Sequence, residues 1–257
     1  MKDNSLELIN LFKEVAKKRW IKGVGRSWGD IGLTFENEIG KRADSEYKPD
    51  YGDIEIKCSS RYSEFPLYLF TISFDGPTDS EISRLVEKYG YYDHDFTDKK
   101  VIFRKITKEI NELNKYNFMF DVDRKQEKIY LCIFDGNGEL LEREAYITFN
   151  KLKEHIETKI RKIAYIRASI KRNDGINYYR YYSINLYNFK GFDTFLKLIE
   201  ENDFHIELIS RIGKSGIFKI KYKNKNIVFS LPKDKIEKLF DCYAEYNNDI
   251  PAFNNML

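Results

Sequence analysis

Apolar residues recur along the chain with two different spacings, and each spacing predicts one kind of element. Leu6, Ile9, Phe12 and Val15 follow one another every three residues after the capping pair Asn4-Ser5, which predicts an amphipathic helix. The same reasoning predicts further helices over residues 79–89, 149–162 and 192–201, and from Pro232 to Cys242.

Between these helices, shorter stretches rich in apolar, β-branched and aromatic residues predict strands. The expected strands cover residues 53–58, 67–74, 101–106, 118–123, 129–134, 140–148, 163–170, 177–186, 204–211, 217–221 and 227–231. Asp135-Gly136-Asn137-Gly138 predicts a hairpin inside an antiparallel meander, and residues 163–170 and 177–186 should pair across Asn173-Asp174-Gly175. The fold class is therefore α/β (α+β). Without a clear linker, we expect one unit over residues 1–257, with two lobes of roughly 1–170 and 171–257.

Composition narrows the class of protein only in part. The chain has 257 residues, of which 42% are hydrophobic, so a folded domain with a sizeable core is expected. Lys and Arg number 44 against 41 Asp and Glu, which gives a net charge of +3. A protein that only coats nucleic acid is usually more basic, whereas a nuclease needs carboxylates for metal. The charge balance therefore neither demands nor excludes DNA.

Several classes of site find no support in the sequence. Cys58, Cys132 and Cys242 are isolated, so neither a zinc site nor a disulfide framework is indicated. The three histidines are scattered, which argues against a Ser-His-Asp triad. The polar start of the chain does not resemble a signal peptide, and no apolar stretch approaches the ~20 residues of a membrane span. We expect a cytoplasmic protein in a reducing compartment.

The most informative segment lies where a turn-prone stretch meets a predicted strand. Asp50 precedes Tyr51-Gly52-Asp53, and Glu55 and Lys57 follow, two residues apart. Residues i and i+2 of a strand point to the same face, so Glu55 and Lys57 should project together while the neighbouring isoleucines enter a core. The turn would fold Asp50 back beside them.

This arrangement suits one kind of chemistry in particular. Two carboxylates can hold a hard divalent cation such as Mg2+, and an adjacent ammonium can hold or deprotonate a metal-bound water. Together they would serve metal-assisted hydrolysis of a phosphodiester. The alternative is an amphipathic edge strand with a solvated Glu-Lys face, because this spacing also arises by chance in chains rich in charge.

The segment before Asp50 favours the catalytic interpretation over the solvated edge strand. Residues 30–40 form a glycine-punctuated stretch with a short helix that carries Glu36. The order G-x-T-F-E, a glycine, and then P-D-x-x-x-I-E-I-K resembles the MvaI/BcnI-type restriction endonucleases. The resemblance continues through Leu69-Phe70-Thr71 and, in weaker form, through residues 118–123, 162–166 and 178–186, so it spans most of the chain.

The resemblance implies a nuclease of the PD-(D/E)xK fold, related to the mismatch-repair enzyme MutH. It implies a catalytic lobe, roughly residues 1–170, with a mixed central sheet flanked by helices, and a β-rich DNA-recognition lobe, roughly residues 171–257. It implies that Asp50 and Glu55 bind the metal, that Lys57 is the catalytic lysine, and that Glu36 lies near the metal. The cofactor would be Mg2+, which Mn2+ can replace. The expected partner is double-stranded DNA, bound by a monomer whose host carries a cognate DNA methyltransferase.

The chain departs from the family pattern at two places. Leu33 stands where the family often has lysine between the glycine and the threonine, and residues 210–230 lack the histidines that some members carry there. The cleavage chemistry therefore carries over more safely than the recognised base sequence, for which the resemblance implies a short, nearly palindromic, GC-rich site.

Candidates for DNA contact lie in two places. Arg211-Ile212-Gly213 matches the family's R-I-G, and arginine can pair bidentately with guanine, so Arg211 is the first candidate for base contact. Lys214, Ser215 and Lys223 follow in the same basic stretch as further candidates for DNA contact. The lysines would bind phosphates, although lysines can also simply guard an edge strand. Tyr179 and Arg180 lie in a tyrosine-rich strand that could face DNA or fill a core.

The expected function is that of a type II restriction endonuclease that makes site-specific double-strand cuts. Two alternatives stay open. A MutH-like repair enzyme would use the same chemistry to nick one strand. A non-catalytic DNA-binding module could keep the fold, although Asp50, Glu55 and Lys57 each hold the residue type that catalysis requires.

Overall fold

The computed structural model describes residues 4–25, 30–41, 48–215 and 219–248, with side chains described outside residues 213–225. Its contacts divide the chain into two compact units. Unit 1 comprises Met1–Leu67, Ile156–Lys190 and Glu237–Leu257, and unit 2 comprises Tyr68–His155 and Gly191–Ile236. The expected lobes were two consecutive halves of the chain, whereas each unit contains separate segments. The expected boundary near residue 170 would also fall inside the strand β10 (Lys162–Asn173).

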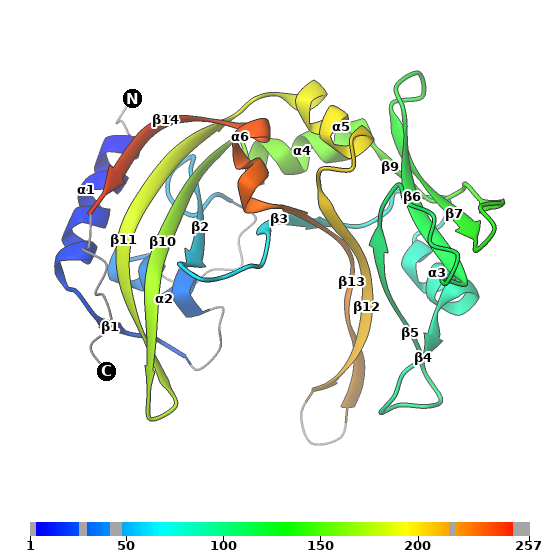
Figure 1. The fold of residues 1–257 in the computed structure, drawn as a ribbon, viewed down its shortest axis with the longest axis horizontal. Coiled ribbons are helices and arrows are strands. Elements are labelled where there is room, and N and C mark those ends of the chain that lie inside the picture. Colours follow the sequence, from blue (N-terminus) through cyan, green and yellow to red (C-terminus); the bar gives the residue numbers. More distant parts are fainter. Residues whose placement is uncertain (1–3, 26–29, 42–47, 216–218, 249–257) are drawn as a thin grey trace. The chain divides into compact units, whose positions relative to one another are not determined.

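Unit 1 is built on a sheet with the strand order β1-β11-β10-β2, in which β14 also pairs with β11 (Figure 1). These strands are β1 (Ile21–Lys22), β2 (Glu55–Ser60), β10 (Lys162–Asn173), β11 (Ile176–Phe189) and β14 (Phe240–Asn247). Strand β2 runs parallel to β10, whereas β10 and β11 form the expected antiparallel hairpin. The sheet of unit 1 is therefore mixed.

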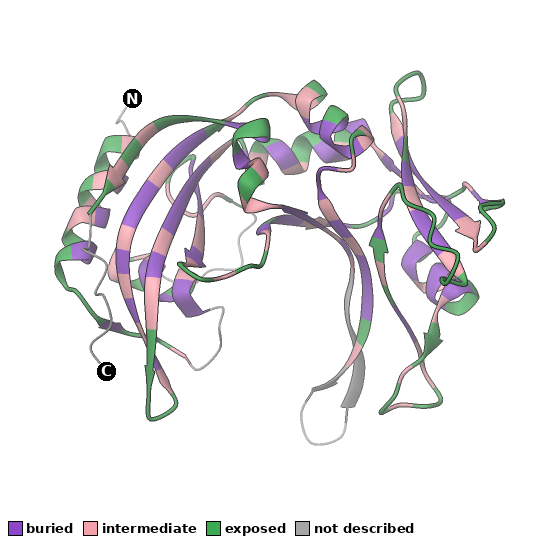
Figure 2. Cartoon of the chain, in the orientation of Figure 1, coloured by how far each residue is buried: buried purple, intermediate pink, exposed green. Residues whose placement is uncertain are grey.

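The core of unit 1 lies between one face of this sheet and two helices, α1 (Asn4–Lys17) and α2 (Asp30–Glu38). Of the four helix residues predicted from the spacing, Phe12 and Val15 are buried there and Ile9 packs against them, whereas Leu6 is exposed. Phe35 of α2 joins this core. Buried and less buried residues alternate along much of β11, whereas Ile163–Ile166 of β10 are all buried (Figure 2). One face of β11 packs against the helices together with Ala164, Ile166 and Ala168 of β10.

Unit 2 contains a second mixed sheet, with the strand order β3-β13-β12-β5-β6-β7-β8 and with β4 and β9 added at β5 and β7. Its strands are β3 (Leu67–Ile72), β4 (Tyr91–Tyr92), β5 (Lys100–Ile106), β6 (Tyr116–Asp123), β7 (Lys128–Asp135), β8 (Leu140–Glu142), β9 (Tyr146–Thr148), β12 (His205–Ser215) and β13 (Lys219–Leu231). Its helices are α3 (Glu81–Tyr89) and α5 (Phe192–Glu200), while α4 (Phe149–Lys159) begins in unit 2 and ends in unit 1. Phe70, Phe195 and Phe229 pack against one another in its core.

The expected elements are mostly present, and three of them differ. The helix expected after Pro232 is only the short η1 (Lys233–Lys235) and α6 (Ile236–Leu239), because the following residues form β14 against β11. The two strands expected between 217 and 231 are the single strand β13. The strand expected over 140–148 is divided into β8 and β9, both paired with β7. Among the described helices, none has the length and apolar character that crossing a membrane requires.

Candidate active site

A tight turn brings Asp50 back to the start of β2. Tyr51 and Ile54 exchange backbone hydrogen bonds of 2.9 Å in both directions, which closes a two-residue turn. Gly52 at its apex has φ of +60°, and a Cβ there would collide with the side chain of Asn4. The turn lets the backbone N–H of Ile56 donate to Oδ2 of Asp50 at 2.9 Å. The carboxylate of Asp50 is thus held beside the second residue of β2.

Strand β2 places Glu55 and Lys57 on one face, as the alternation predicted. Nζ of Lys57 donates to Oε1 of Glu55 at 3.0 Å. Ile54 and Ile56 lie in the core of unit 1. Cys58 also packs against that core, and its burial raises the pKa of the thiol, which makes it a packing residue rather than a nucleophile.

Two further lysines, which the sequence did not single out, complete the cluster. Nζ of Lys41 donates to Oδ1 of Asp50 and lies 3.8 Å from Oε2 of Glu36. Nζ of Lys159, in the last turn of α4, lies 3.5 Å from Oε2 of Glu55. Three carboxylates and three ammonium groups of the described residues therefore gather at the start of β2, and their formal charges cancel.

Glu36 is a carboxyl of this cluster whose surroundings shift its pKa. It lies on α2, as expected, and its backbone carbonyl accepts a 2.9 Å hydrogen bond from the N–H of Lys41. Burial raises the pKa of Glu36, and the neighbouring Asp50 raises it further, while Lys41 opposes both. Such a shift is typical of carboxyl groups in functional sites, although ion-pair networks can also produce it.

The residues present fit a hard divalent cation. Oε2 of Glu55 is buried and accepts no hydrogen bond from the described residues, with the ammonium of Lys159 3.5 Å away, so this oxygen can still serve as a ligand. No group of three or more His, Cys, Asp or Glu side chains in the described part of the chain could by itself hold a metal. A magnesium site of one or two carboxylates meets this limit, because Mg2+ keeps several waters and binds substrate phosphate.

The candidates for DNA contact are placed very differently from one another. Arg211 is exposed on β12, with its guanidinium carbon 4.6 Å from the ring centre of Phe103. Lys214, Ser215 and Lys223 lie on the paired strands β12 and β13, but their side chains are outside the described residues. Their contact with DNA stays a prediction.

The tyrosine-rich strand β11 supports one of its two candidates. Arg180 is half-buried on one face of β11. Tyr179 is completely buried in the core of unit 1, where its hydroxyl accepts a hydrogen bond from Nδ2 of Asn177. Because successive residues of a strand point to opposite faces, these two side chains cannot both reach a duplex. The expectation that Tyr179 binds DNA is therefore wrong.

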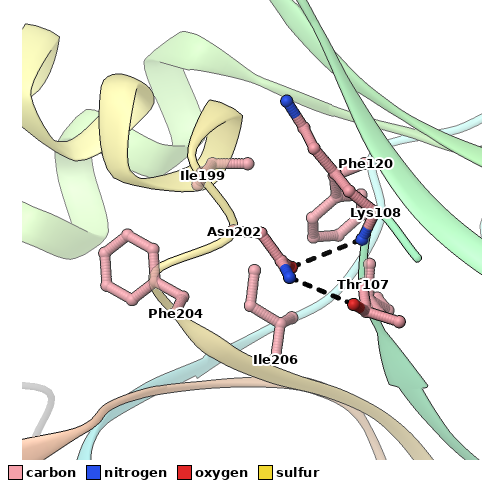
Figure 3. Close-up of a pocket in the computed structure, with 8 residues that line it drawn as sticks. Thr107, Lys108, Phe120, Ile199, Asn202, Phe204 and Ile206 are labelled. Carbon is pink, nitrogen blue, oxygen red and sulfur yellow. Dashed lines mark hydrogen bonds between the residues drawn. The ribbon is translucent and has the colours of Figure 1, made fainter.

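Unit 2 contains a cavity lined by Thr107, Phe120 and Asn202 among others, which is too small for a ligand (Figure 3). Its volume of about 10 Å3 has room for roughly one water molecule. Asn202 spans it, donating to Oγ1 of Thr107 at 3.1 Å and accepting from the N–H of Lys108 at 3.4 Å. This cavity belongs to the packing of α5 against β5 and β6 rather than to a site for a base or nucleotide.

Comparisons with known proteins show the family of the chain. The model of the MvaI/BcnI restriction endonuclease family matches residues 9–240. The chain belongs to the MvaI/BcnI restriction endonuclease family. It is therefore a type II restriction endonuclease, an enzyme that hydrolyses phosphodiester bonds within DNA, and the predicted fold class, family and enzyme class are confirmed.

Two solved structures are similar over almost the whole chain. The complex of restriction endonuclease MvaI with its cognate DNA substrate superposes with a TM-score of 0.81 and is 25% identical, covering 95% of this chain and 98% of that chain. MvaI in the absence of DNA superposes with a TM-score of 0.59 at 22% identity and the same coverage. No curated protein matches the chain.

Proposed function

We propose that this enzyme cuts both strands of double-stranded DNA at a specific site, with a divalent cation held by Asp50 and Glu55. The observation that carries the proposal is the buried oxygen of Glu55 that has no hydrogen-bond partner among the described residues, on the strand that also carries Lys57. The likeness to MvaI, which was solved with its cognate DNA substrate, supports DNA as the partner.

The residues of the cluster would have different roles in the reaction. Asp50 and Glu55 would hold the cation, and Lys57 would orient and help to deprotonate the attacking water. A bound cation would supply Lewis-acid stabilisation of the negative charge that develops on the phosphate and on the leaving oxygen. Glu36, a carboxyl of raised pKa near Asp50, is proposed as a further catalytic carboxyl that shapes the charge of the site.

Lys41 and Lys159 would position these groups. Lys41 bridges the carboxylates of Asp50 and Glu36, and Lys159 lies beside Glu55. Both ammonium groups keep the carboxylates compact when no cation is bound, since carboxylates this close to one another repel.

The resemblance to the family supports further properties, which are part of the same proposal. The cation is Mg2+, which Mn2+ can replace, and the enzyme acts as a monomer in the cytoplasm. Its site is short, nearly palindromic and GC-rich, and the host carries a cognate DNA methyltransferase. Arg211 is proposed to contact a base, and Lys214, Ser215, Lys223 and Arg180 are proposed to contact the DNA backbone.

One experiment tests the reaction and separates it from its alternatives. The purified protein is incubated with supercoiled plasmid and Mg2+, beside a Lys57→Ala control. Double-strand cleavage gives a linear product, whereas a strand-nicking enzyme stops at the open circle. An unchanged plasmid, with DNA binding intact, would indicate a non-catalytic module. Sequencing the ends of the linear product would then identify the site.

A further inference from the structure

The face of β2 that carries the catalytic groups leads to an arginine just after the strand. Glu55, Lys57 and Ser59 alternate along the strand, and Arg61 follows two residues later, in the turn after Ser60. The N–H of Arg61 donates to the carbonyl of Ala168 at 2.9 Å, which is the last hydrogen bond between β2 and β10. The four residues from Lys57 to Arg61 span at most about 13 Å.

The neighbouring strands bring two more residues to this place. Ser59 is paired with Arg167 of β10, and Arg167 is paired with Ser183 of β11. The register between β10 and β11 shifts at this point, so Tyr182 has no partner on β10. Its carbonyl instead accepts a 2.8 Å hydrogen bond from the N–H of Asn248. Bulges of this kind redirect side chains and are frequent beside active sites.

The two arginines converge on one aromatic ring. The guanidinium carbon of Arg61 lies 5.8 Å from the ring centre of Tyr182, and that of Arg167 lies 5.7 Å from the same centre. Nε of Arg167 also donates to Oγ of Ser183 at 2.8 Å, which fixes the orientation of its guanidinium. The three side chains form a defined cluster, which we call the Arg61–Arg167–Tyr182 cluster.

The charge of this cluster is not balanced by acidic groups. Neither Arg61 nor Arg167 forms an ion pair with a carboxylate of the described residues, whereas Arg84, Arg124, Arg143 and Arg161 each do. Two guanidinium groups at one ring repel each other unless an anion lies near them. Their planar donors match the oxygens of a phosphate, and the tyrosine hydroxyl can donate as well.

We propose that the Arg61–Arg167–Tyr182 cluster binds backbone phosphates of the duplex that is cut. This inference rests on the proposed cleavage of DNA and adds a second contact to it. A span of at most about 13 Å from Lys57 corresponds to a few nucleotide steps of about 3.4 Å, so the cluster would hold the substrate away from the scissile bond. Such contacts would add affinity and fix the position of the protein along the duplex, but they would not read the base sequence.

The test measures the salt dependence of DNA binding, with cleavage prevented by omission of divalent cations. Anisotropy titrations of a cognate and a scrambled duplex, from about 50 to 200 mM KCl, give the slope of log affinity against log salt. Arg61→Gln and Arg167→Gln should each reduce the magnitude of this slope by about 0.9, the value for one lost phosphate contact. Both duplexes should lose affinity equally.

Matched variants keep the result interpretable. Arg161→Gln removes an exposed arginine of unit 1 that pairs with Glu157, and it should leave the slope unchanged. Arg61→Lys keeps the charge and should restore most of the slope. Among the described residues the guanidinium of Arg61 contacts only the rings of Tyr62 and Tyr182, so Arg61→Gln carries the test if Arg167→Gln fails to fold.

An unchanged slope in folded Arg61→Gln would overturn the proposal, and so would a loss confined to the cognate duplex. These outcomes are distinguishable from failure of the proposed function. If the wild type converts plasmid to linear product while the slopes of the variants equal the wild-type slope, only the phosphate cluster is wrong.

Discussion

The ammonium nitrogen of Lys159 lies 3.5 Å from Oε2 of Glu55, although α4 and β2 are far apart in sequence. The same nitrogen donates to the carbonyl of Lys48 at 3.2 Å, just before the Pro49-Asp50 pair. Lys159 thereby connects the segment that carries one candidate metal ligand to the strand that carries the other.

Replacing Lys159 with Met should lower the cleavage rate by about 10- to 100-fold, because small displacements of catalytic groups cost rates of this order. Affinity for the cognate duplex without divalent cations should stay within a few-fold. Single-turnover cleavage and anisotropy titrations measure the two effects. Lys153→Met alters an exposed lysine of the same helix and serves as the control. Equal rates in both variants would remove Lys159 from the site.

Lys57→Ala should reduce cleavage at least about 100-fold, the usual scale for losing proton-transfer catalysis. Binding should change little, because Lys57 is proposed to act on the water and on the transition state rather than on the bound duplex. Plasmid linearisation and duplex titration, run on one preparation, compare the two. Cleavage at the wild-type rate would mean that the active-site assignment is wrong.

Asp50→Asn should also abolish cleavage, for a different reason. The amide oxygen can still accept the N–H of Ile56, so the turn should survive, but the charge that attracts a cation is lost. Direct Mn2+ binding, followed by electron paramagnetic resonance, should weaken in Asp50→Asn and persist in Lys57→Ala. In the wild type, Ca2+ should support DNA binding without turnover. Rapid cleavage in Ca2+ would contradict this mechanism.

Unit 2 should lose stability in acid through Glu142. Burial alone would raise the pKa of Glu142, but hydrogen bonds from Arg84, Lys88 and Tyr89 together lower it from 4.5 to about 2. A folded-state pKa below the unfolded one stabilises the fold at higher pH, and this contribution is lost as pH falls from 4.5 through about 2.

Glu142→Gln should therefore cost about 1–3 kcal/mol of unfolding free energy at neutral pH. Its stability should also fall less than that of the wild type between pH 4.5 and about 2. Urea unfolding at several pH values checks both statements. Glu144→Gln, at an exposed position nearby, should behave like the wild type. Parallel stability curves for Glu142→Gln and the wild type would show that the ion pairs contribute nothing net.

Local periodicity predicted much of this fold because alternation and helical spacing record which face is buried. Ile54 and Ile56 against Glu55 and Lys57 are the clearest case, since a strand leaves no other choice once the core side is known. The same rule shows why Tyr179 and Arg180 could not both be DNA contacts. Applying it to that strand would have assigned Tyr179 to the core.

Contacts between segments far apart in the sequence could not be predicted from local patterns. Residues 240–247 alternate apolar and polar side chains, yet the predicted helix takes in the first three of them, up to Cys242, because nothing local reveals that β11 offers them an edge. Lys159 is one of many lysines, and only the packing of α4 brings it to Glu55. Lys41 had a weak local signal, since it follows the helix that carries Glu36.

Arg211→Ala and Lys223→Ala should impair DNA binding in different ways. The exposed guanidinium of Arg211, proposed to read guanine, should contribute about 1–3 kcal/mol of discrimination against the wrong base. Lys223, proposed to bind phosphate, carries no sequence information, so its loss should weaken all duplexes equally and reduce the salt slope. Titrating both variants against cognate and scrambled duplexes at two salt concentrations separates these effects. If Arg211→Ala keeps the full cognate-to-scrambled ratio, Arg211 does not read the sequence, and the base contacts must come from other residues.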